Sequence, residues 1–599
     1  MVGGWAARPC ENACAFSRGS RLLLNGAHSA LLGAARPCEN ANALSRGSRL
    51  LLNLQSMFTF RYRELAVPLE KKGDVRTCLA KEIKVHPEEI FNLQVERFSL
   101  DSRKKGNPHW SYNVVFDLKR QVRATGNQAK GLIESKREVS SLDHDPQKNA
   151  HPMARHVDVI GAGPSGLWAA LHLLRKGFEV DLYEQGKNVE ERFRDIRRFF
   201  VDKKFNAHSN VLFGEGGAGA FSDGKLNTRS RNLFSETVLK DMVAFGVDES
   251  VVTFAKPHIG TDKLVLMLRK IRAEIVRLGG KIHFSTMLED IEIKNGHITA
   301  IKLRDVSSPT ISGSIQPSNW KNCEALVLAV GHSARNIYQM LHARGVALES
   351  KPFAMGVRVE HPQSLINIRQ LGPHVDTRLT GAAEYFLATP TLKQTCSAYS
   401  FCMCPGGVLV PCASEPNTLA TNGMSYSARN GKTANGAIVV PIAASKDLFG
   451  GLQFQRKTEA DAFDVGGKSY AAPAQSIKAF IAHQLDKELA KSTYPMGLAK
   501  CNMWDWMDKT LCESLAEGFL NFDKKIPGFV ENGLIVAPET RTSSPLRITR
   551  NPETLESINT QGLYVLGEGA GYSGGIVTSA ADGIRLAHIS TPSTNSSKG

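Results

Sequence analysis

The sequence predicts an α/β protein built around a dinucleotide-binding fold of the Rossmann type, and three observations support this fold class. A short apolar strand at 157–160 leads into a turn with three glycines in G-x-G-x-x-G spacing, Gly161, Gly163 and Gly166. An amphipathic helix with one apolar stripe follows this turn. A second strand, at 179–183, then ends in the acidic residue Glu184.

Each part of this unit has a chemical role in holding a dinucleotide. The glycines permit a tight turn, close backbone approach to a pyrophosphate and close packing of helix on strand. A carboxylate at position 184 can accept hydrogen bonds from both ribose hydroxyls of an adenosine, whereas a 2′-phosphate would favour arginine there. The nucleotide is therefore expected to be FAD or NAD rather than NADP.

A second glycine-rich string, NVLFGEGGAGAFSDGKL, repeats the same spacing at Gly214, Gly216 and Gly219. The residues after these glycines are polar and turn-like, so the string does not predict a second strand–turn–helix unit. It is either a structural loop or a loop that lines the pyrophosphate or the flavin ring of a cofactor. Its charged and hydroxyl residues favour the lining role.

A strand near the C-terminus suits a flavin. The strand at 562–566 ends in Gly567 and Glu568 and precedes a helix that begins near Ile576. A carboxylate at this place can bond a ribityl chain, and the helix N-terminus can stabilise negative charge at the pyrimidine edge of the flavin. Because NAD alone would not require this second contact, the sequence favours FAD.

Composition places the chain among ordinary globular proteins. Its 599 residues, 42% hydrophobic and 22% charged, suit about two to four domains, and no apolar run is long enough for a membrane span. Eleven scattered cysteines predict no disulfide framework and suggest a reducing compartment. The net charge of +16 could indicate nucleic-acid binding. The basic residues at 103–137 lack aromatic stacking partners, however, so a solvated surface or linker is the favoured interpretation.

The first 56 residues contain a tandem repeat, because residues 6–25 recur at 34–53 with 18 of 20 positions identical. Two copies are too few for a solenoid. The segment is rich in Arg, Ala, Leu and Ser and poor in acidic residues, as organelle transit peptides are, and we therefore expect a leader at 1–56. A wrongly assigned gene start, with Met57 as an alternative start, is the competing interpretation.

The rest of the chain divides into six expected segments. In order they are a small α/β module (57–123), a polar linker (124–154), the first part of the nucleotide domain (155–340), an inserted substrate or cap domain (341–540), the second part of the nucleotide domain (541–588) and a disordered tail (589–599). Within the module, strands are expected at 58–65, 90–100 and 111–118, and a helix at 75–83.

Several long strings carry a resemblance to a known family, among them KPHIGTDKL, LAVGHSAR, KPFAMGVRVEHPQ, YSFCMCPGG, ETRTSSPLRITR and GLYVLGEGAGYSGGIVTSAADG. Over about residues 57–588 the chain resembles FAD-dependent dehydrogenases, or oxidoreductases, of bacteria and plant plastids, which have no settled substrate. The resemblance implies an FAD-binding domain of the glutathione-reductase type with an inserted substrate domain. It also favours a plastid (chloroplast) over a mitochondrion as the destination of the leader.

The motifs assign the cofactor to a set of residues. Those expected to bind FAD are Gly161, Gly163, Gly166, Glu184, Arg192, Gly331, Gly567, Glu568 and Ile576. Arg192 follows the second strand of the first motif and could reach the pyrophosphate, but an exposed helix arginine is an equal alternative.

Catalytic candidates are fewer. Cys402 and Cys404 could shuttle electrons as a dithiol beside a flavin, but C-x-C departs from the C-x-x-C spacing of redox motifs, and two buried structural thiols are favoured. Arg541, in a hydroxyl-rich string, could bind an anionic substrate or the flavin, or belong to a structural network. No metal site is expected. The isolated histidines, His258, His332 and His361, are interpreted as structural.

The predicted function is that of an FAD-dependent oxidoreductase that passes hydride or electrons between the flavin and a small substrate. No separate NAD(P)H-binding unit is evident, so a pyridine nucleotide is expected to bind transiently as electron donor, if at all. Two alternatives stay open: an RNA-binding flavoprotein of the tRNA-modifying type, and an assembly protein with a structural FAD. The expected partner is the small-molecule substrate, with neither nucleic acid nor a membrane span, and the oligomeric state is left open.

Overall fold

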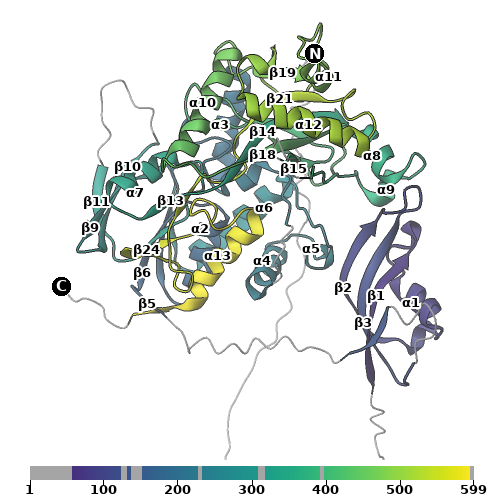
Figure 1. Ribbon diagram of the computed structural model, residues 1–599. Coiled ribbons are helices and arrows are strands. Elements are labelled where there is room, and N and C mark those ends of the chain that lie inside the picture. The colour runs from purple at the N-terminus through teal and green to yellow at the C-terminus, as the bar shows by residue number, and fades with distance from the viewer. Residues whose placement is uncertain are drawn as a thin grey trace, which may run out of the picture. The chain divides into compact units, whose positions relative to one another are not determined.

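The computed structural model describes residues 57–122, 131–135, 151–226, 232–307, 318–390 and 397–593. The predicted leader at 1–56 lies outside the described residues, as do most of the predicted linker and the end of the predicted tail. The α/β fold class is confirmed: the larger described sheets have four, nine and six strands (Figure 1).

The four-stranded sheet forms the N-terminal module, in the order β2-β3-β1-β4. Its elements are β1 (Phe58–Val67), α1 (Val75–Ile83), β2 (Phe91–Asp101), β3 (His109–Leu118) and β4 (Leu132–Glu134). Helix α1 contacts β1 and buries its apolar side chains in the module's own core. Strand β4 pairs with β1 and lies inside the predicted linker, which is a correction. Its three residues are too few for an alternating pattern to reveal a strand.

The nine-stranded sheet lies within the two predicted parts of the nucleotide domain, 155–340 and 541–588, and has a main path β11-β10-β24-β12-β6-β7-β8. Its strands are β6 (His156–Ile160), β7 (Glu179–Tyr183), β8 (Lys281–His283), β9 (Thr286–Lys294), β10 (His297–Asp305), β11 (Ser318–Asn322), β12 (Leu326–Leu328), β23 (Glu556–Ser557) and β24 (Thr560–Val565). β24 pairs in parallel with β12, which pairs in parallel with β6. The return strand predicted near the C-terminus therefore lies two strands from the first glycine motif.

Two helices pack closely against one another beside this sheet, α2 (Pro164–Arg175) and α13 (Ile576–Ile589) (Figure 1). Nearly every residue of α2 from Ser165 to Leu174 is buried, as expected for a helix that is covered on several sides. A Cβ on Gly583 of α13 would lie 2.3 Å from the carbonyl oxygen of Ser165, so only glycine permits this close crossing.

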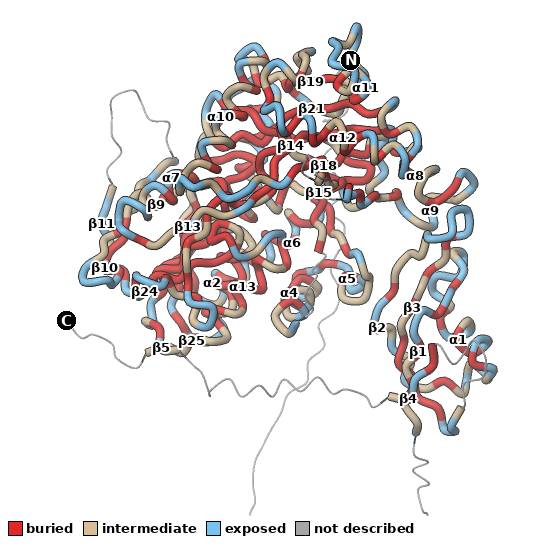
Figure 2. The backbone as a smooth tube through the Cα atoms, viewed as in Figure 1, coloured by how far each residue is buried: buried red, intermediate tan, exposed pale blue. Residues whose placement is uncertain are grey.

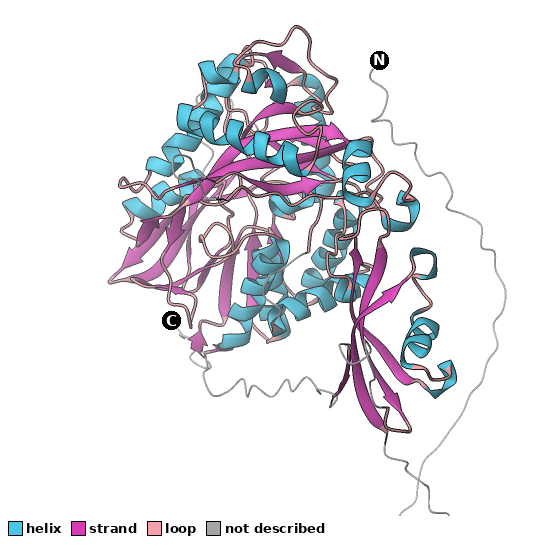
Figure 3. Ribbon diagram, turned by 45° about the vertical axis from the view of Figure 1, so that its right-hand side comes forward, coloured by secondary structure: helices cyan, strands magenta, loops and turns pink. Residues whose placement is uncertain are grey.

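The six-stranded sheet has the order β15-β18-β14-β21-β19-β20. All its strands lie between residues 353 and 539: β14 (Phe353–Pro362), β15 (Tyr399–Cys404), β18 (Thr433–Ile442), β19 (Ala472–Ser476), β20 (Leu498–Lys500) and β21 (Leu534–Glu539). Every residue of β14 before Pro362 is buried (Figure 2). Helices α8 (Gln363–Leu371), α10 (Gly450–Val465) and α12 (Lys509–Lys525) contact its strands (Figure 3).

The remaining elements are shorter or connect the sheets. The helices are α3 (Val189–Asp202), α4 (Leu233–Ala244), α5 (Ser250–Thr253), α6 (Thr261–Arg277), α7 (Arg335–Ala343), α9 (Thr377–Thr380) and α11 (Ile477–Ile481). The strands are β5 (His151–Met153), β13 (Leu348–Ser350), β16 (Val408–Pro411), β17 (Thr421–Met424), β22 (Leu546–Ile548) and β25 (Ser590–Pro592). The 3-10 helices are η1 (Leu69–Lys71), η2 (Pro87–Glu89), η4 (Gly217–Phe221) and η5 (Met503–Asp505).

One of these strand pairs corrects the predicted linker and tail. Residues 590–592 form β25, which pairs in parallel with β5 at the end of the predicted linker. The predicted disordered tail therefore begins too early. The domain boundaries themselves stay predictions. Among the described residues, no helix has both the length and the apolar character needed to cross a membrane.

Candidate functional site

One cavity lies at the carboxyl ends of the parallel strands, where ligands bind in open α/β sheets. Residues that follow β6, β7, β12 and β24 line it on one side, including Gly161, Glu184, Gly331 and Glu568. Another part of the lining comes from the segment that carries the six-stranded sheet: Phe401, Cys402, Asn422, Arg541 and Thr542. The fold thus brings six of the nine predicted cofactor residues and two of the three catalytic candidates to the same space.

The three glycines of the first motif have different environments. Gly161 has φ +102°, and a Cβ on it would lie 2.4 Å from the carbonyl oxygen of Ala329. A Cβ on Gly166 would lie 1.9 Å from the carbonyl oxygen of Gly161. Gly163 lines the cavity, as Gly161 does, but a Cβ there would have a single neighbour, the Cα of Gly217, at 4.0 Å. Gly161 and Gly166 therefore serve the turn, and Gly163 keeps space free.

Gly163 also precedes the first turn of α2, which no side chain caps among the described residues. The first N–H groups of a helix have no partner within the helix, and the helix dipole adds positive potential at this end. Since Gly163, Pro164 and Ser165 line the cavity, the N-terminus of α2 can receive an anion there.

Glu184 connects two loops that line the cavity. Its carboxylate is 6% exposed and accepts hydrogen bonds from the backbone N–H groups of Ala162 (2.8 Å), Gly186 (2.9 Å) and Gly214 (2.9 Å). These bonds join the first glycine motif to the second glycine-rich loop. Because a carboxylate has about four acceptor positions, one stays available for a further donor, fewer than the two ribose hydroxyls predicted from the sequence.

The second glycine-rich loop lines the cavity beside the first motif. The N–H of Gly216 donates to the carbonyl of Ala162 (2.8 Å), and Gly217 lies opposite Gly163. The loop continues through η4 and brings Lys225 to the cavity wall. It is therefore a lining loop that has no strand–turn–helix unit of its own, as the polar sequence after it indicates.

The structure places Arg192 neither at a pyrophosphate site nor on an exposed helix face, the two positions suggested by the sequence. It is fully buried and does not line the cavity. Its guanidinium donates to four backbone carbonyls of the second loop: those of Asn210 (2.7 Å), Val211 (2.8 Å), Gly214 (3.3 Å) and Glu215 (2.7 Å). Burial lowers the pKa of Arg192 to about 10. Its place in the structure is that of a support for the loop, not a contact to a pyrophosphate.

A second helix N-terminus faces the same cavity. Gly575 precedes α13, no described side chain caps that helix, and Gly575, Ile576 and Ser579 line the cavity. Glu568 lies 3.5 Å from Nδ1 of His332, and Nε2 of that buried histidine has no hydrogen-bond partner among the described residues. His332 therefore belongs to the cavity wall, whereas the sequence suggested a structural histidine.

Gly567 lies behind the wall. Its N–H donates to Asp582 (2.8 Å), and a Cβ on it would lie 2.0 Å from Oγ of Ser165. Like Gly166, it allows close packing around α2 and does not line the cavity.

Arg541, a lining residue that follows β21, has hydrogen-bond donors without partners among the described residues. Nη2 of this arginine donates to Glu459 (2.8 Å) and to Oγ of Ser414 (2.5 Å). Its Nε and Nη1 are buried and have no hydrogen-bond partner among the described residues. Burial, followed by the charge of neighbouring Arg335, lowers the pKa of Arg541. Buried donors without partners indicate a ligand that completes the hydrogen bonding.

The two cysteines of the C-x-C string occupy different positions. Cys402 lines the cavity and is partly exposed, whereas Cys404 is fully buried behind it. Nη2 of Arg358 lies 2.9 Å from the carbonyl oxygen of Cys402 and 3.4 Å from Sγ of Cys404. Lys225 donates to the carbonyl of Met403 between them. Neither cation was predicted as a site residue, although Lys225 lies in the second glycine-rich string, whose charged residues favoured a lining role. Arg358 could have been noticed as a charge within an apolar strand.

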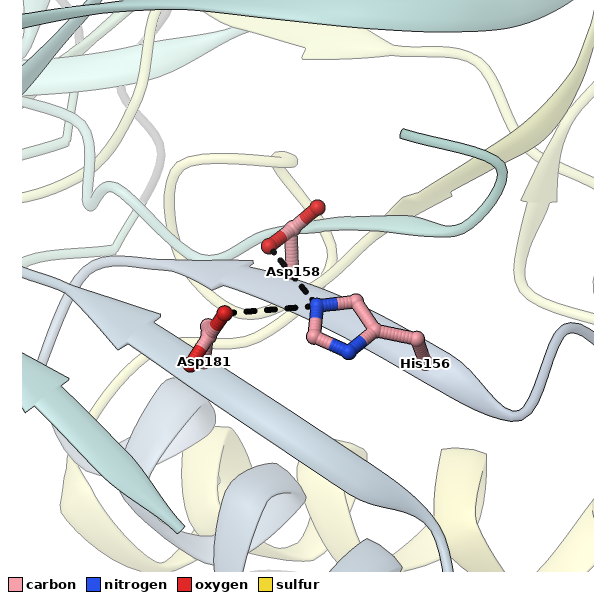
Figure 4. Close-up of side chains that lie close together, drawn as sticks. All are labelled: His156, Asp158 and Asp181. Carbon is pink, nitrogen blue, oxygen red and sulfur yellow. Dashed lines mark ion pairs between the residues drawn. The ribbon is translucent and has the colours of Figure 1, made fainter. Parts of the chain in front are cut away.

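A group of side chains away from the cavity resembles a metal site. His156 Nε2 lies 3.5 Å from Asp158 and 3.3 Å from Asp181 (Figure 4). The ammonium of Lys321 lies 2.9 Å from Asp181 and 3.3 Å from His156 Nε2, and it also contacts Asp158. A lysine already supplies the positive charge that these carboxylates need, so we interpret the group as an ion-pair network.

Two other histidines and the basic segment have structural contacts. His258 contacts the carbonyl of Ser427 (3.1 Å), and buried His361 contacts that of Phe529 (2.8 Å). In the described part of the basic segment, Arg103 pairs with Asp101 and Arg120 with Glu89. These ion pairs partly neutralise the surface that motivated the RNA-binding alternative, and nothing in the described residues supports that alternative.

Comparison with known proteins gives the family. Residues 352–542 match the model "FAD-dependent protein, C-terminal domain-like", and residues 159–210 match an NAD(P)-binding Rossmann-like domain. An uncharacterised protein of Clostridium beijerinckii is 40% identical over 535 residues, which cover 87% of this chain and 95% of that protein. The chain belongs to this family of FAD-dependent proteins. Because the relative is bacterial, it gives no support to the predicted plastid location.

Solved structures of flavoproteins are more distant. A glycerol-3-phosphate dehydrogenase from Bacillus halodurans complexed with FAD is 9% identical at a TM-score of 0.32, covering 73% of this chain and 63% of that one. The L-proline dehydrogenase of P. horikoshii is 12% identical at a TM-score of 0.30, covering 73% of this chain and 94% of that one. At these values neither structure bears on the reaction of this chain.

The residues around the cavity fit FAD. Two uncapped helix N-termini reach one cavity, and Glu184 lies beside the first of them. The space at Gly163 is one that a Cβ would begin to fill. Arg541 and His332 line the cavity, and both have buried polar atoms without a hydrogen-bond partner among the described residues. A dinucleotide has a ribose, a pyrophosphate and a charge-accepting ring to match these features, and FAD is the cofactor of this family member.

Proposed function

We propose that this chain is an FAD-dependent oxidoreductase that passes hydride equivalents between FAD and a small substrate held against the inserted segment. The observation that carries the proposal is the shared cavity, whose walls come from the nucleotide domain on one side and from residues 401–542 on the other. FAD, when bound, supplies the two-electron chemistry, while the protein orients the substrate and excludes competing reactions.

On the cofactor side we assign roles by charge and position. The N-terminus of α2, with the open space at Gly163, would hold the pyrophosphate. Glu184 would accept a hydrogen bond from the adenosine ribose. The N-terminus of α13 and Glu568 would face the ribityl chain and the ring.

On the substrate side, Arg541 is the strongest candidate for recognition. Its Nε and Nη1 atoms have no hydrogen-bond partner among the described residues, and each can donate a charged hydrogen bond to an anion. Since Arg541 lines the cavity and follows β21 of the six-stranded sheet, we assign it to an anionic group of the substrate. The substrate class on this account is a small organic anion.

The electron donor has no dedicated binding domain among the described residues. In the described residues, the second glycine string opens a 3-10 helix instead of a second Rossmann unit. A pyridine nucleotide would therefore bind transiently, at the cavity mouth, without a domain of its own.

The test is an anaerobic absorption spectrum of the purified full chain before and after addition of NADH and then NADPH. Bleaching of the flavin band by one nucleotide would establish the reductase half-reaction and identify the donor. If dithionite reduces the flavin and neither nucleotide does, another donor must supply the electrons. A bound flavin that dithionite also fails to reduce would contradict the proposal and favour a structural cofactor.

A further inference from the structure

We propose that Cys402 and Cys404 form a redox-active dithiol, and that the small substrate of this flavoprotein is a disulfide or the corresponding thiol. This inference deepens the proposed function and rests on it, because electrons from the pair must pass to or from FAD. It also differs from the sequence interpretation, which favoured two structural thiols.

The first support is the position of the pair. In a regular strand, residues i and i+2 lie about 6.6 Å apart, at the upper end of the Cα separations that a disulfide spans. Here the pairing of β15 with β18 is irregular between Phe401 and Cys404, and Cys402 has φ +43°. At this bulge Cys402 lines the cavity, and Sγ of Cys404 lies 3.4 Å from the carbonyl oxygen of Cys402. Cys402 faces the cavity while Cys404 stays behind it, as attacking and resolving thiols require.

The second support is the charge around the pair. Arg358 contacts the carbonyl of Cys402 and Sγ of Cys404, and Lys225 contacts the carbonyl of the residue between them. The hydrogen bond from Cys404 and the charges of Lys225 and Arg358 lower the pKa of Cys402. The neighbouring thiolate raises the pKa of Cys404. The two opposite directions favour Cys402, the thiol that faces the cavity, as the attacking nucleophile.

Three other buried cysteines have pKa values shifted in the opposite direction to that of Cys402. Burial raises the pKa of the Cys323, Cys412 and Cys512 thiols. None of these three lines the cavity. Lys225 and Arg358 are themselves paired with Asp223 and Glu539, so the positive charge beside the thiols is partly balanced. Cys402 still combines access, two neighbouring cations and a partner thiol, and these are features of a reactive cysteine.

The proposed reaction is a thiol–disulfide exchange between the substrate and the two cysteines, followed by electron transfer from FAD. The Cys402 thiolate attacks one sulfur of the substrate disulfide, so that the substrate S–S bond breaks, a mixed disulfide forms, and the first substrate thiolate leaves and takes a proton from solvent. Cys404, losing its proton, attacks Sγ of Cys402. The Cys402–Cys404 bond forms, and the second substrate thiol leaves with that proton. Two electrons and two protons from reduced FAD then restore both thiols, and Cys402 returns one proton to solvent as it becomes the thiolate again. The reverse sequence oxidises the substrate thiols.

The experiment counts electrons in the full-length, FAD-loaded protein by anaerobic titration with dithionite. The wild type should take up about four electrons per FAD, because a disulfide is a two-electron couple beside the two-electron flavin. The variants Cys402→Ser and Cys404→Ser should each take up about two, and the control Cys512→Ser about four. A pre-oxidised wild type that takes up only two electrons per FAD would overturn the proposal.

A second measurement uses wild-type protein alone, so it does not depend on whether the variants fold. Wild-type protein is oxidised with diamide or left reduced, treated with an alkylating agent and analysed by tandem mass spectrometry. In the oxidised sample, Cys402 and Cys404 should escape alkylation together and be joined to each other, and in the reduced sample both should be alkylated. Alkylation of both residues in both samples would contradict the dithiol. The proposed function fails separately, if the bound flavin cannot be reduced.

Discussion

A side chain at Gly163 should affect cofactor binding without affecting folding, unlike one at the other two glycines of the motif. Its neighbours Gly161 and Gly166 have backbone oxygens within 2.4 Å of any added Cβ, so side chains there must disturb the turn. Gly163 has an ordinary φ of −78° and meets only the Cα of Gly217 at 4.0 Å. A side chain at 163 therefore costs little in the empty protein and occupies the space of the ligand.

This contrast gives the first prediction. Gly163→Val should fold with near wild-type stability in the absence of FAD but retain at least about tenfold less FAD, because its side chain fills the pyrophosphate position and blocks the helix N–H groups. Gly166→Ala should instead lower the unfolding free energy by more than about 1 kcal/mol. Thermal melts of the FAD-free proteins and FAD titrations measure both. A Gly163→Val protein that binds FAD normally would remove the pyrophosphate from this position.

Arg541 carries the prediction for the substrate side. Replacing it by Gln removes a charged donor, and hydrogen bonds to charged groups contribute about 1.5–3 kcal/mol. Arg541→Gln should therefore weaken the binding of a carboxylate probe, benzoate, by on the order of tenfold to a hundredfold, measured as a perturbation of the flavin spectrum. FAD content should not change, and Arg547→Gln, at a half-buried arginine that does not line the cavity, serves as the control. Loss of FAD from Arg541→Gln, with the fold intact, would instead assign the arginine to the cofactor.

At the scale of elements, the second glycine-rich loop depends on one buried side chain. Arg192 of α3 donates to four carbonyls of this loop, and its guanidinium also lies over the ring of Phe221 in η4. Lysine has no planar fork and cannot satisfy these carbonyls together. The position of the loop, and thus of the cavity wall, follows from this contact.

Arg192→Lys should therefore act on folding before it acts on the cofactor. We expect the FAD-free variant to lose about 2–4 kcal/mol of unfolding free energy, because buried carbonyls lose their donors. Urea unfolding of the FAD-free protein measures this loss, with the exposed Arg277→Lys as control. An unchanged unfolding midpoint together with weakened FAD binding would mean that Arg192 contacts the pyrophosphate after all.

Elements with a strong local pattern were predictable from sequence, and elements held by distant partners were not. The strand at Glu179–Tyr183 and the helix at Val75–Ile83 have the predicted bounds, because their apolar periodicity and flanking turns are local. Strands β4 and β25 have three residues each and depend on partners far away in the chain. The fork of Arg192 faces carbonyls whose orientation only the folded loop determines.

The candidate site shows the same division. The glycines, Glu184 and Glu568 follow from recognisable strand–turn patterns, and the structure places Glu184 and Glu568 at one cavity. The convergence of Cys402, Lys225 and Arg358 could not be predicted, because these residues come from three segments that meet only in the folded chain. The bulge in β15 that exposes Cys402 is likewise a product of pairing with β18.

At the scale of the whole molecule, the cofactor cavity links the two large sheets. Its walls run from Ile160 at the end of β6 to Ser579 in α13 and include residues of the inserted segment. A ligand that contacts both sides stabilises the native state of both by mass action.

Removal of FAD should therefore lower the stability of both sheets together. At a free FAD concentration a hundredfold above the dissociation constant, we expect a stabilisation of about 2.7 kcal/mol relative to the FAD-free chain. Hydrogen exchange should show increased protection in β6 and in β14 on FAD binding, and Gly163→Val should lack this response. Protection confined to the nine-stranded sheet would contradict a cavity shared by both.

The most direct measurement is the identity and amount of the nucleotide that the full chain carries. The cofactor is released from purified protein by denaturation, separated by chromatography and quantified against the protein. We predict FAD at about one molecule per chain, because a single cavity collects both helix N-termini and Glu184. Release of NAD, or of no nucleotide from a chain that also fails to bind added FAD, would contradict the account.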